Sequence, residues 1–126
     1  MKKSIVFLVT TGVLFLVFQS FIVNSAPALP IPEDVQGVLK NSCYDCHSNE
    51  ASNKKAQFVL NFNKWEEFKA SKKISRLEDI CALVEEGKMP PEKYVNNKPD
   101  RALSDSQKAL ICDWTKKESA TLMEGN

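Results

Sequence analysis

Five consecutive residues constrain this 126-residue chain more than any other feature: Cys43-Tyr44-Asp45-Cys46-His47. His47 is the only histidine in the protein, so any chemistry that needs an imidazole has to be built at this pentapeptide. Two thiols three positions apart, followed directly by an imidazole, have the spacing that attaches a haem through two thioether bonds and ligates its iron. We therefore predict covalent haem attachment at Cys43 and Cys46, with His47 as the proximal iron ligand.

Two other uses of this motif compete with haem attachment. A redox-active dithiol is expected in a βαβ setting, but no strand pattern precedes Cys43 and no useful strand alternation occurs elsewhere in the sequence. A structural zinc site could combine the motif with a fourth ligand from Cys81 or Cys112. Such a site would take two ligands from the neighbouring positions Cys46 and His47, and the sequence offers no second pair of ligands. Haem attachment is favoured over both.

The amino-terminal segment has the pattern of an export signal. Lys2 and Lys3 precede a mostly apolar stretch without charge from residue 5 to residue 23, and small residues follow it. This order is typical of a signal peptide, although the stretch is close to the ~20 residues that cross a bilayer. We expect residues 1–26 to be a signal peptide or an uncleaved membrane anchor. The rest of the chain is then periplasmic, either free or anchored to the inner membrane through residues 5–23.

The remaining length allows one folded domain. Residues 27–32 contain three prolines and predict a stiff, extended linker. Residues 33–126 are too few for two domains of ordinary size. The 17 basic and 16 acidic residues of the chain nearly cancel, and no block of like charge occurs. This balance argues against a surface for nucleic acid.

Helical periodicity predicts a small all-α domain of about four helices wrapped around one haem. Apolar residues repeat at helical spacing, and the strongest signals are capping boxes at Ser75 and Ser104 and a left-handed cap at Gly87. Residues 48–57 are polar and predict a loop, and residues 58–62 are expected to be irregular or extended. The predicted helices cover residues 33–40, 63–71, 76–86 and 104–121.

Met89 is the candidate for the second axial iron ligand. It lies in the sequence Gly87-Lys88-Met89-Pro90-Pro91, where the two prolines restrict the backbone that would present the thioether. Met123 lies three residues from the end of the chain, where fraying is expected. The alternative that Met89 only packs against a haem face stays open, since methionine is a common core residue.

Several parts of the sequence together fit one known pattern. They are residues 41–50 (NSCYDCHSNE), Leu60-Asn61-Phe62 with Trp65, Glu85-Glu86-Gly87-Lys88-Met89-Pro90 with Tyr94, and Leu103-Ser104 leading to Asp113-Trp114. In these parts the chain resembles the haem-binding domain family of small exported monohaem c-type cytochromes, over most of residues 33–116. The resemblance implies a fold like that of the class I cytochromes c.

The resemblance also implies a role for each candidate site residue. Cys43 and Cys46 would be the thioether sites, His47 the proximal ligand and Met89 the distal one. The chain departs from the family pattern at residues 51–57, which are short and polar where members carry a longer insertion rich in aromatic residues and proline. One haem edge is therefore expected to be more exposed or covered differently.

Cys81 and Cys112 fall on two predicted helices and lie outside the family pattern. In an oxidising compartment, two cysteines left over from haem attachment favour a disulfide between them. A bridge that closes about 32 residues would stabilise the domain by roughly 3–4 kcal/mol. The alternative is a pair of buried free thiols.

The predicted function is the transfer of single electrons by a haem c with His/Met ligation, without enzymatic chemistry and with redox proteins as unidentified partners. Six-coordinate His/Met ligation closes the iron to other ligands, and the thioether ligand raises the reduction potential. The rival is a five-coordinate haem sensor or a peroxidase-like protein. The sequence offers that rival neither a second histidine nor an arginine close to Met89.

Overall fold

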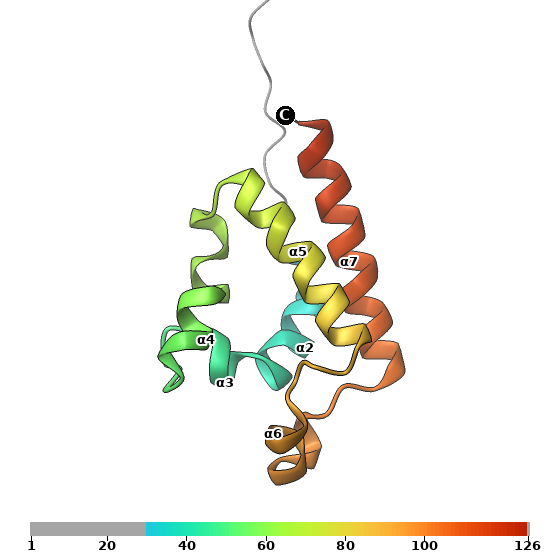
Figure 1. Cartoon of the computed structure of the whole chain (residues 1–126). Coiled ribbons are helices and arrows are strands. Elements are labelled where there is room, and N and C mark those ends of the chain that lie inside the picture. The colour runs from blue at the N-terminus through green and yellow to red at the C-terminus, as the bar shows by residue number, and fades with distance from the viewer. Residues whose placement is uncertain (1–29, 126) are drawn as a thin grey trace, which may run out of the picture.

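The computed structural model describes residues 30–125, and within this range the chain forms helices and loops without a strand (Figure 1). The prediction of an all-α domain is confirmed. The elements are α2 (Glu33–Ser42), α3 (Tyr44–His47), α4 (Lys54–Val59), η2 (Phe62–Glu67), α5 (Ala70–Glu85), α6 (Glu92–Asn97), η3 (Pro99–Arg101) and α7 (Asp105–Glu124). Among these helices, none has the length and apolar character of a bilayer-spanning segment. The predicted signal or anchor lies outside the described residues.

Helices α5 and α7 lie side by side and form the frame of the domain (Figure 1). Leu77 on α5 and Ile111 on α7 are almost completely buried. A disulfide joins Cys81 to Cys112 across the two helices, with 4.9 Å between their Cα atoms. The predicted pairing of these cysteines is confirmed.

The caps of the two long helices follow the sequence signals in part. Ser104 Oγ accepts a hydrogen bond from the Gln107 N–H, and the Gln107 side chain accepts one from the Ser104 N–H, as the capping box predicts. Gly87 follows α5 with a φ of 68°, the left-handed conformation that glycine adopts without strain. The Ser75 capping box, however, lies inside α5. This helix begins at Ala70, because the buried face continues back through Lys73.

Three other sequence-based expectations need correction. The predicted loop of residues 48–57 ends in α4, which Asn53 caps by accepting a hydrogen bond from the Ala56 N–H at 3.1 Å. The predicted helix of residues 63–71 is the 3-10 helix η2, capped by Asn61. Helices α6 and η3 lie in a stretch for which no helix was expected. These helices are short, and their apolar residues are too few to give a periodic signal.

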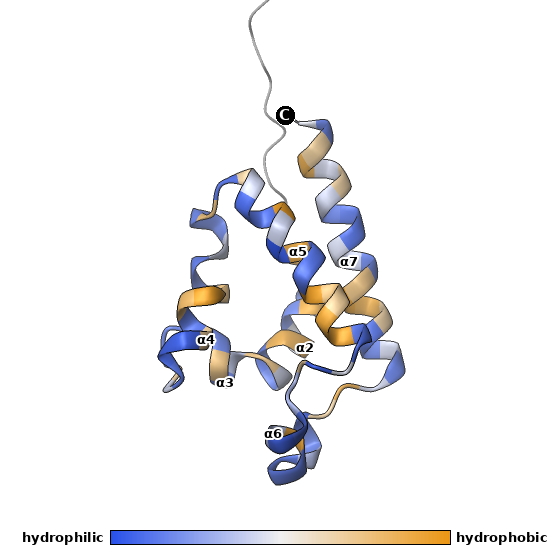
Figure 2. Cartoon of the chain, in the orientation of Figure 1, coloured by the Kyte–Doolittle hydropathy of each residue, from blue (hydrophilic) through white to orange (hydrophobic). Residues whose placement is uncertain are grey.

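The core extends from the frame through a cluster of aromatic rings. Trp65 is 1% exposed, and its ring centroid lies 5.8 Å from that of Trp114 and 6.0 Å from that of Phe68. Phe62 joins the same cluster at 6.4 Å from Trp65. The hydrophobic stretches of the ribbon gather where α2, α5 and α7 meet (Figure 2). Ile31, near the end of the predicted linker, is also buried in this core.

Candidate haem-binding site

The thiol and imidazole motif lies at the junction of two helices. Helix α2 buries Val35 and Leu39 in the core and ends at Ser42, and α3 then carries the motif. The N–H of Cys43 still donates a hydrogen bond to the Leu39 carbonyl at 2.8 Å. The buried face of α2 therefore fixes the backbone from which the thiols and the imidazole project.

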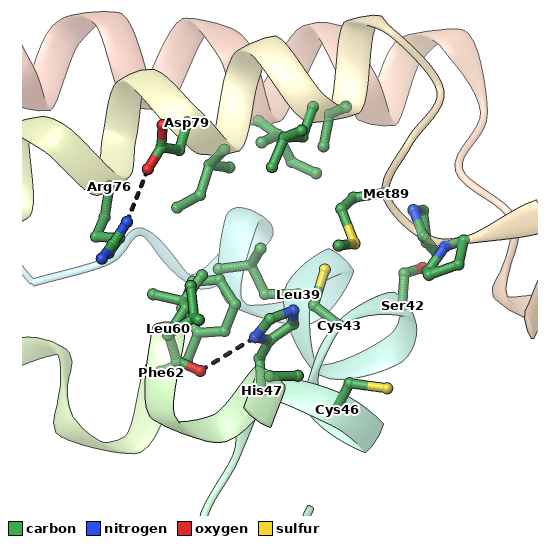
Figure 3. A pocket seen from close by; sticks show the side chains of 18 of the residues that line it. Leu39, Ser42, Cys43, Cys46, His47, Leu60, Phe62, Arg76, Asp79 and Met89 are labelled. Atoms are coloured by element: carbon green, nitrogen blue, oxygen red, sulfur yellow. Dashed lines mark hydrogen bonds and ion pairs between the residues drawn. The ribbon is translucent and has the colours of Figure 1, made fainter. Parts of the chain in front are cut away.

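One mainly apolar pocket brings together all four residues predicted from the sequence, Cys43, Cys46, His47 and Met89 (Figure 3). Its walls come from every long helix and from the loop after α5. The apolar residues among them are Leu39, Ala56, Val59, Leu60, Phe62, Ile80, Leu83, Val84, Pro90, Pro91 and Ile111. Such a lining suits a flat hydrophobic cofactor, which is held by contact with apolar side chains.

The His47 ring is held in one orientation. Its Nδ1 lies 3.1 Å from the Leu60 carbonyl oxygen, which can only accept a hydrogen bond. Nδ1 is therefore the protonated nitrogen, and Nε2 keeps the lone pair that a metal ligand needs. Figure 3 shows the second ring nitrogen pointing into the pocket, toward Met89 and Cys43. The ring edge also meets the Phe62 ring at a centroid distance of 6.3 Å.

A small network of asparagines places the Leu60 carbonyl. The buried Asn61 donates from Nδ2 to Asn49 Oδ1 at 2.9 Å, and the Asn49 N–H donates to Asn63 Oδ1 at 2.9 Å. These bonds fasten the segment after α4 to the residues that follow His47. The orientation of the imidazole therefore depends on a contact between two segments thirteen residues apart.

Met89 reaches the pocket from the loop after α5. Its N–H donates to the Leu83 carbonyl at 3.1 Å, so the loop folds back onto the last turn of the helix. The side chain is half-buried and packs against the core. In Figure 3 its sulfur points toward His47 and Cys43. The thioether and the free imidazole nitrogen thus point into the same pocket.

The two thiols of the motif are free, and their environment argues against the competing uses of the motif. Burial, with a smaller contribution from Cys46, raises the pKa of Cys43 to about 12. A redox dithiol needs the opposite shift, because its nucleophile is a thiolate. Within residues 30–125, the one cluster of metal-ligating side chains is Cys81, Glu85 and Cys112. The disulfide occupies both of these cysteines, so neither provides a fourth thiolate for zinc at the motif.

An ion pair interrupts the apolar wall. Arg76 and Asp79 on α5 both line the pocket, and Arg76 Nη1 donates to Asp79 Oδ2 at 2.8 Å. This arginine was not predicted from the sequence, because only arginines close to Met89 in the chain were considered. A signal was present: Arg76 precedes Ile80 by four residues and Val84 by eight, which places all three on one helix face.

Tyr94 connects the pocket wall to the motif. Its hydroxyl donates to Asp45 Oδ2 at 2.9 Å, and Lys98 Nζ reaches the same oxygen at 2.7 Å. The hydrogen bond from Lys98, followed by the one from Tyr94, lowers the pKa of Asp45. Burial and the hydrogen bond to Asp45 raise the pKa of Tyr94 to about 12. Helix α6 is thereby tied to α3.

Helix α4 covers the edge where the sequence departs from the family pattern. Asn53, Ala56 and Val59 line the pocket from this helix, while the neighbouring Phe58 is 89% exposed. The short polar segment is therefore not an open gap. From Lys54 on it belongs to α4, a helix that faces the pocket on one side and solvent on the other.

A family model described as a haem-binding domain matches residues 52–117. The chain belongs to the haem-binding domain family. The matched residues of this haem-binding domain include Met89, Arg76 and most of the pocket wall, and they begin after the thiol and imidazole motif. The chain matches no curated protein and no solved structure.

The residues at the pocket fit the cofactor that the family name implies. Two free thiols, one imidazole nitrogen with a lone pair and one thioether belong to residues that line one mainly apolar pocket. These are the donors that a covalently attached haem takes from a protein. The roles of Cys43, Cys46, His47 and Met89 in that attachment remain predictions.

Proposed function

We propose that this haem-binding domain is an exported electron-transfer protein, which carries one electron at a time on a haem c attached to Cys43 and Cys46. The axial ligands in this proposal are His47 and Met89. The observation that carries it is the convergence of these four side chains on one apolar pocket. A haem ligated by histidine and methionine takes up and releases a single electron at its iron.

Each part of the pocket has a task in this proposal. The thiols hold the cofactor to the chain, and the Leu60 carbonyl keeps His47 in the tautomer that ligates through Nε2. Met89 would supply the second protein ligand of the iron and so close it to other ligands. The apolar walls keep water away, which favours the less charged ferrous state and raises the reduction potential.

Of the rival functions, a peroxidase-like protein needs a proton-transferring group beside the iron, whereas a five-coordinate sensor needs an open coordination position. The acidic side chain in the pocket lining of the described residues is Asp79, and the basic one besides His47 is Arg76. It is engaged in an ion pair with Asp79, and both lie at the end of the pocket away from His47 and Met89 (Figure 3). This placement favours electron transfer over a peroxidase-like function, and the carbon monoxide test below separates it from a sensor.

The decisive experiment compares the purified exported protein with its Met89→Ala variant. The denatured wild type should keep its haem through acid-acetone extraction and have the mass of the chain plus one haem. Its ferric form should be low-spin and its ferrous form indifferent to carbon monoxide. Met89→Ala should become high-spin and bind carbon monoxide. Met123→Ala serves as the control, because Met123 is 55% exposed and lies outside this pocket.

Two results would refute the proposal in different ways. Extracted protein that is colourless and has the mass of the bare chain would remove covalent attachment. Rapid carbon monoxide uptake by the ferrous wild type at neutral pH would keep the haem but favour the five-coordinate rival. Export is tested separately, by cell fractionation and by sequencing the amino terminus of the mature protein.

A further inference from the structure

Arg76 has a buried hydrogen-bond donor for which residues 30–125 provide no acceptor. Its Nη1 is bonded to Asp79, but its Nε is buried and has no acceptor within the described residues. Buried N–H groups in folded proteins nearly always have a partner, so an exception requires an explanation. Because Arg76 lines the haem pocket, the ligand of that pocket is the natural source of an acceptor.

The position of Arg76 matches one particular part of a haem. Figure 3 shows Arg76 and Asp79 on α5 at the end of the pocket away from Cys43 and Cys46. A haem carries its vinyl groups and its two propionate carboxylates on opposite edges of the macrocycle. If the two thiols hold the vinyl edge, the propionate edge faces the end where Arg76 lies.

The free edge of the guanidinium also has the right chemistry. Asp79 occupies Nη1, which leaves the parallel N–H groups of Nε and Nη2, the fork that binds a carboxylate in a bidentate manner. Among the described residues that line the pocket, Arg76 is the only basic one apart from His47. We propose that Arg76 binds a haem propionate, and that Asp79 is a positioning residue that holds the guanidinium in place. This proposal rests on the haem attachment proposed above.

The test uses the haem-loaded protein and the variants Arg76→Gln and Arg76→Lys. Glutamine removes the charge and the fork, whereas lysine keeps the charge and removes the fork. The control is Lys117→Gln, which removes one positive charge from an exposed position on α7. Two quantities are measured: the propionate bending band in the resonance Raman spectrum and the equilibrium constant for reduction of the haem.

The propionate band should shift in both Arg76 variants and stay in place in Lys117→Gln. The equilibrium constant for reduction should fall about fivefold to tenfold in Arg76→Gln, where tenfold equals about 59 mV for a one-electron couple. It should fall less in Arg76→Lys. The physical reason is that a positive charge beside the haem stabilises the state with the extra electron.

An unchanged propionate band in Arg76→Gln overturns the proposal. Equal shifts in Arg76→Gln and Lys117→Gln also overturn it, since they would report net charge alone. If Arg76→Gln does not mature, the Raman band of Arg76→Lys decides the question. A wild-type protein without covalent haem refutes the proposed function, whereas a haem-loaded wild type with unaltered Arg76 variants refutes only the propionate contact.

Discussion

The frame of α5 and α7 and the segment that carries Met89, residues 86–104, are held in place by different forces. The frame buries Leu77 and Ile111 and is crossed by a disulfide. In the Met89 segment, neither α6 nor η3 contains a buried residue. Figure 2 shows α6 as mainly hydrophilic, whereas hydrophobic stretches line the frame. One region is built by hydrophobic burial and the other by polar contacts.

The polar contacts that α6 and η3 make with the rest of the described chain reach residues 41–45. Tyr94 and Lys98 bond to Asp45 inside the motif, and Arg101 Nη1 donates to the Asn41 carbonyl at 2.6 Å. The Asn41 side chain returns a hydrogen bond to the carbonyl of residue 100 at 3.2 Å. Residues 41–47, which would attach the haem, therefore also bind α6 and η3 and so help to position the segment that contains Met89, the proposed sixth ligand. The frame supplies a large part of the buried apolar core, whereas the proposed ligation by Met89 would depend on a segment held by a few polar contacts.

Truncation to alanine should have unequal effects in the two regions, beyond the one carbon by which isoleucine exceeds valine. Ile111→Ala removes a completely buried side chain and should lower the free energy of unfolding by about 2–5 kcal/mol. Val95→Ala, on the half-buried face of α6, should lower it by less than about 1 kcal/mol. Chemical denaturation followed by circular dichroism measures both. Similar losses in the two variants would contradict the division into frame and segment.

The disulfide should stabilise the frame without affecting the sixth ligand. Replacing both cysteines, Cys81→Ala with Cys112→Ala, should lower the free energy of unfolding by about 2–4 kcal/mol, because the unfolded chain loses a constraint. The low-spin ferric spectrum should remain. The control is wild-type protein under reductant, with alkylation and mass measurement to count thiols. A high-spin spectrum in the double variant would show that the bridge also positions Met89.

The same division explains which elements the sequence predicted. The long helices were predictable because their apolar residues repeat with helical period and because Ser104 and Gly87 mark their ends. Helix α6 was not, since its place depends on contacts such as Tyr94 with Asp45, 49 residues apart. The start of α5 was misplaced because a charged residue, Lys73, continues the buried face.

The candidate site was predictable to the extent that its chemistry is local. Cys43, Cys46 and His47 lie within five positions, and the prolines after Met89 mark its loop, so composition and spacing were sufficient to select them. Arg76 is separated from the motif by 29 residues or more and becomes relevant only when α5 turns it toward the pocket. Its place at the pocket therefore becomes visible only in the folded structure.

One buried carboxyl is expected to weaken the frame. Glu118 on α7 is 4% exposed, and its Oε1 is buried without a hydrogen-bond partner within the described residues. Burial raises its pKa above the ordinary value of 4.5, Lys73 opposes the shift, and Glu66 adds to it. The folded state therefore holds this proton more tightly than the unfolded state. The free energy of unfolding should fall as the pH rises from about 4.5 through the raised pKa.

Glu118→Gln removes this titration and should raise the free energy of unfolding at pH 7 by about 1 kcal/mol, with a flatter pH profile above pH 4.5. Thermal or urea unfolding at several pH values measures the change. Glu124→Gln, an exposed glutamate on the same helix, is the control and should leave the profile unaltered. A variant less stable than the wild type at pH 7 would mean that the charged form of Glu118 stabilises the frame.

The smallest change in stability should accompany a clear change at the sixth ligand. Tyr94→Phe removes one exposed hydrogen bond to Asp45 and should cost less than about 1 kcal/mol of unfolding free energy. Because that bond fastens the Met89 segment, the variant should release Met89 more often. The apparent affinity of the ferric protein for imidazole, which competes for the sixth position, should rise about threefold to tenfold.

Tyr44→Phe is the matched control, since within the described residues the Tyr44 hydroxyl has no hydrogen-bond partner and its ring stacks on Phe62. Equal imidazole affinity in both variants would show that the hydrogen bond from Tyr94 to Asp45 does not keep Met89 in position. The contact between Arg101 and Asn41 would then be the next one to test by substitution.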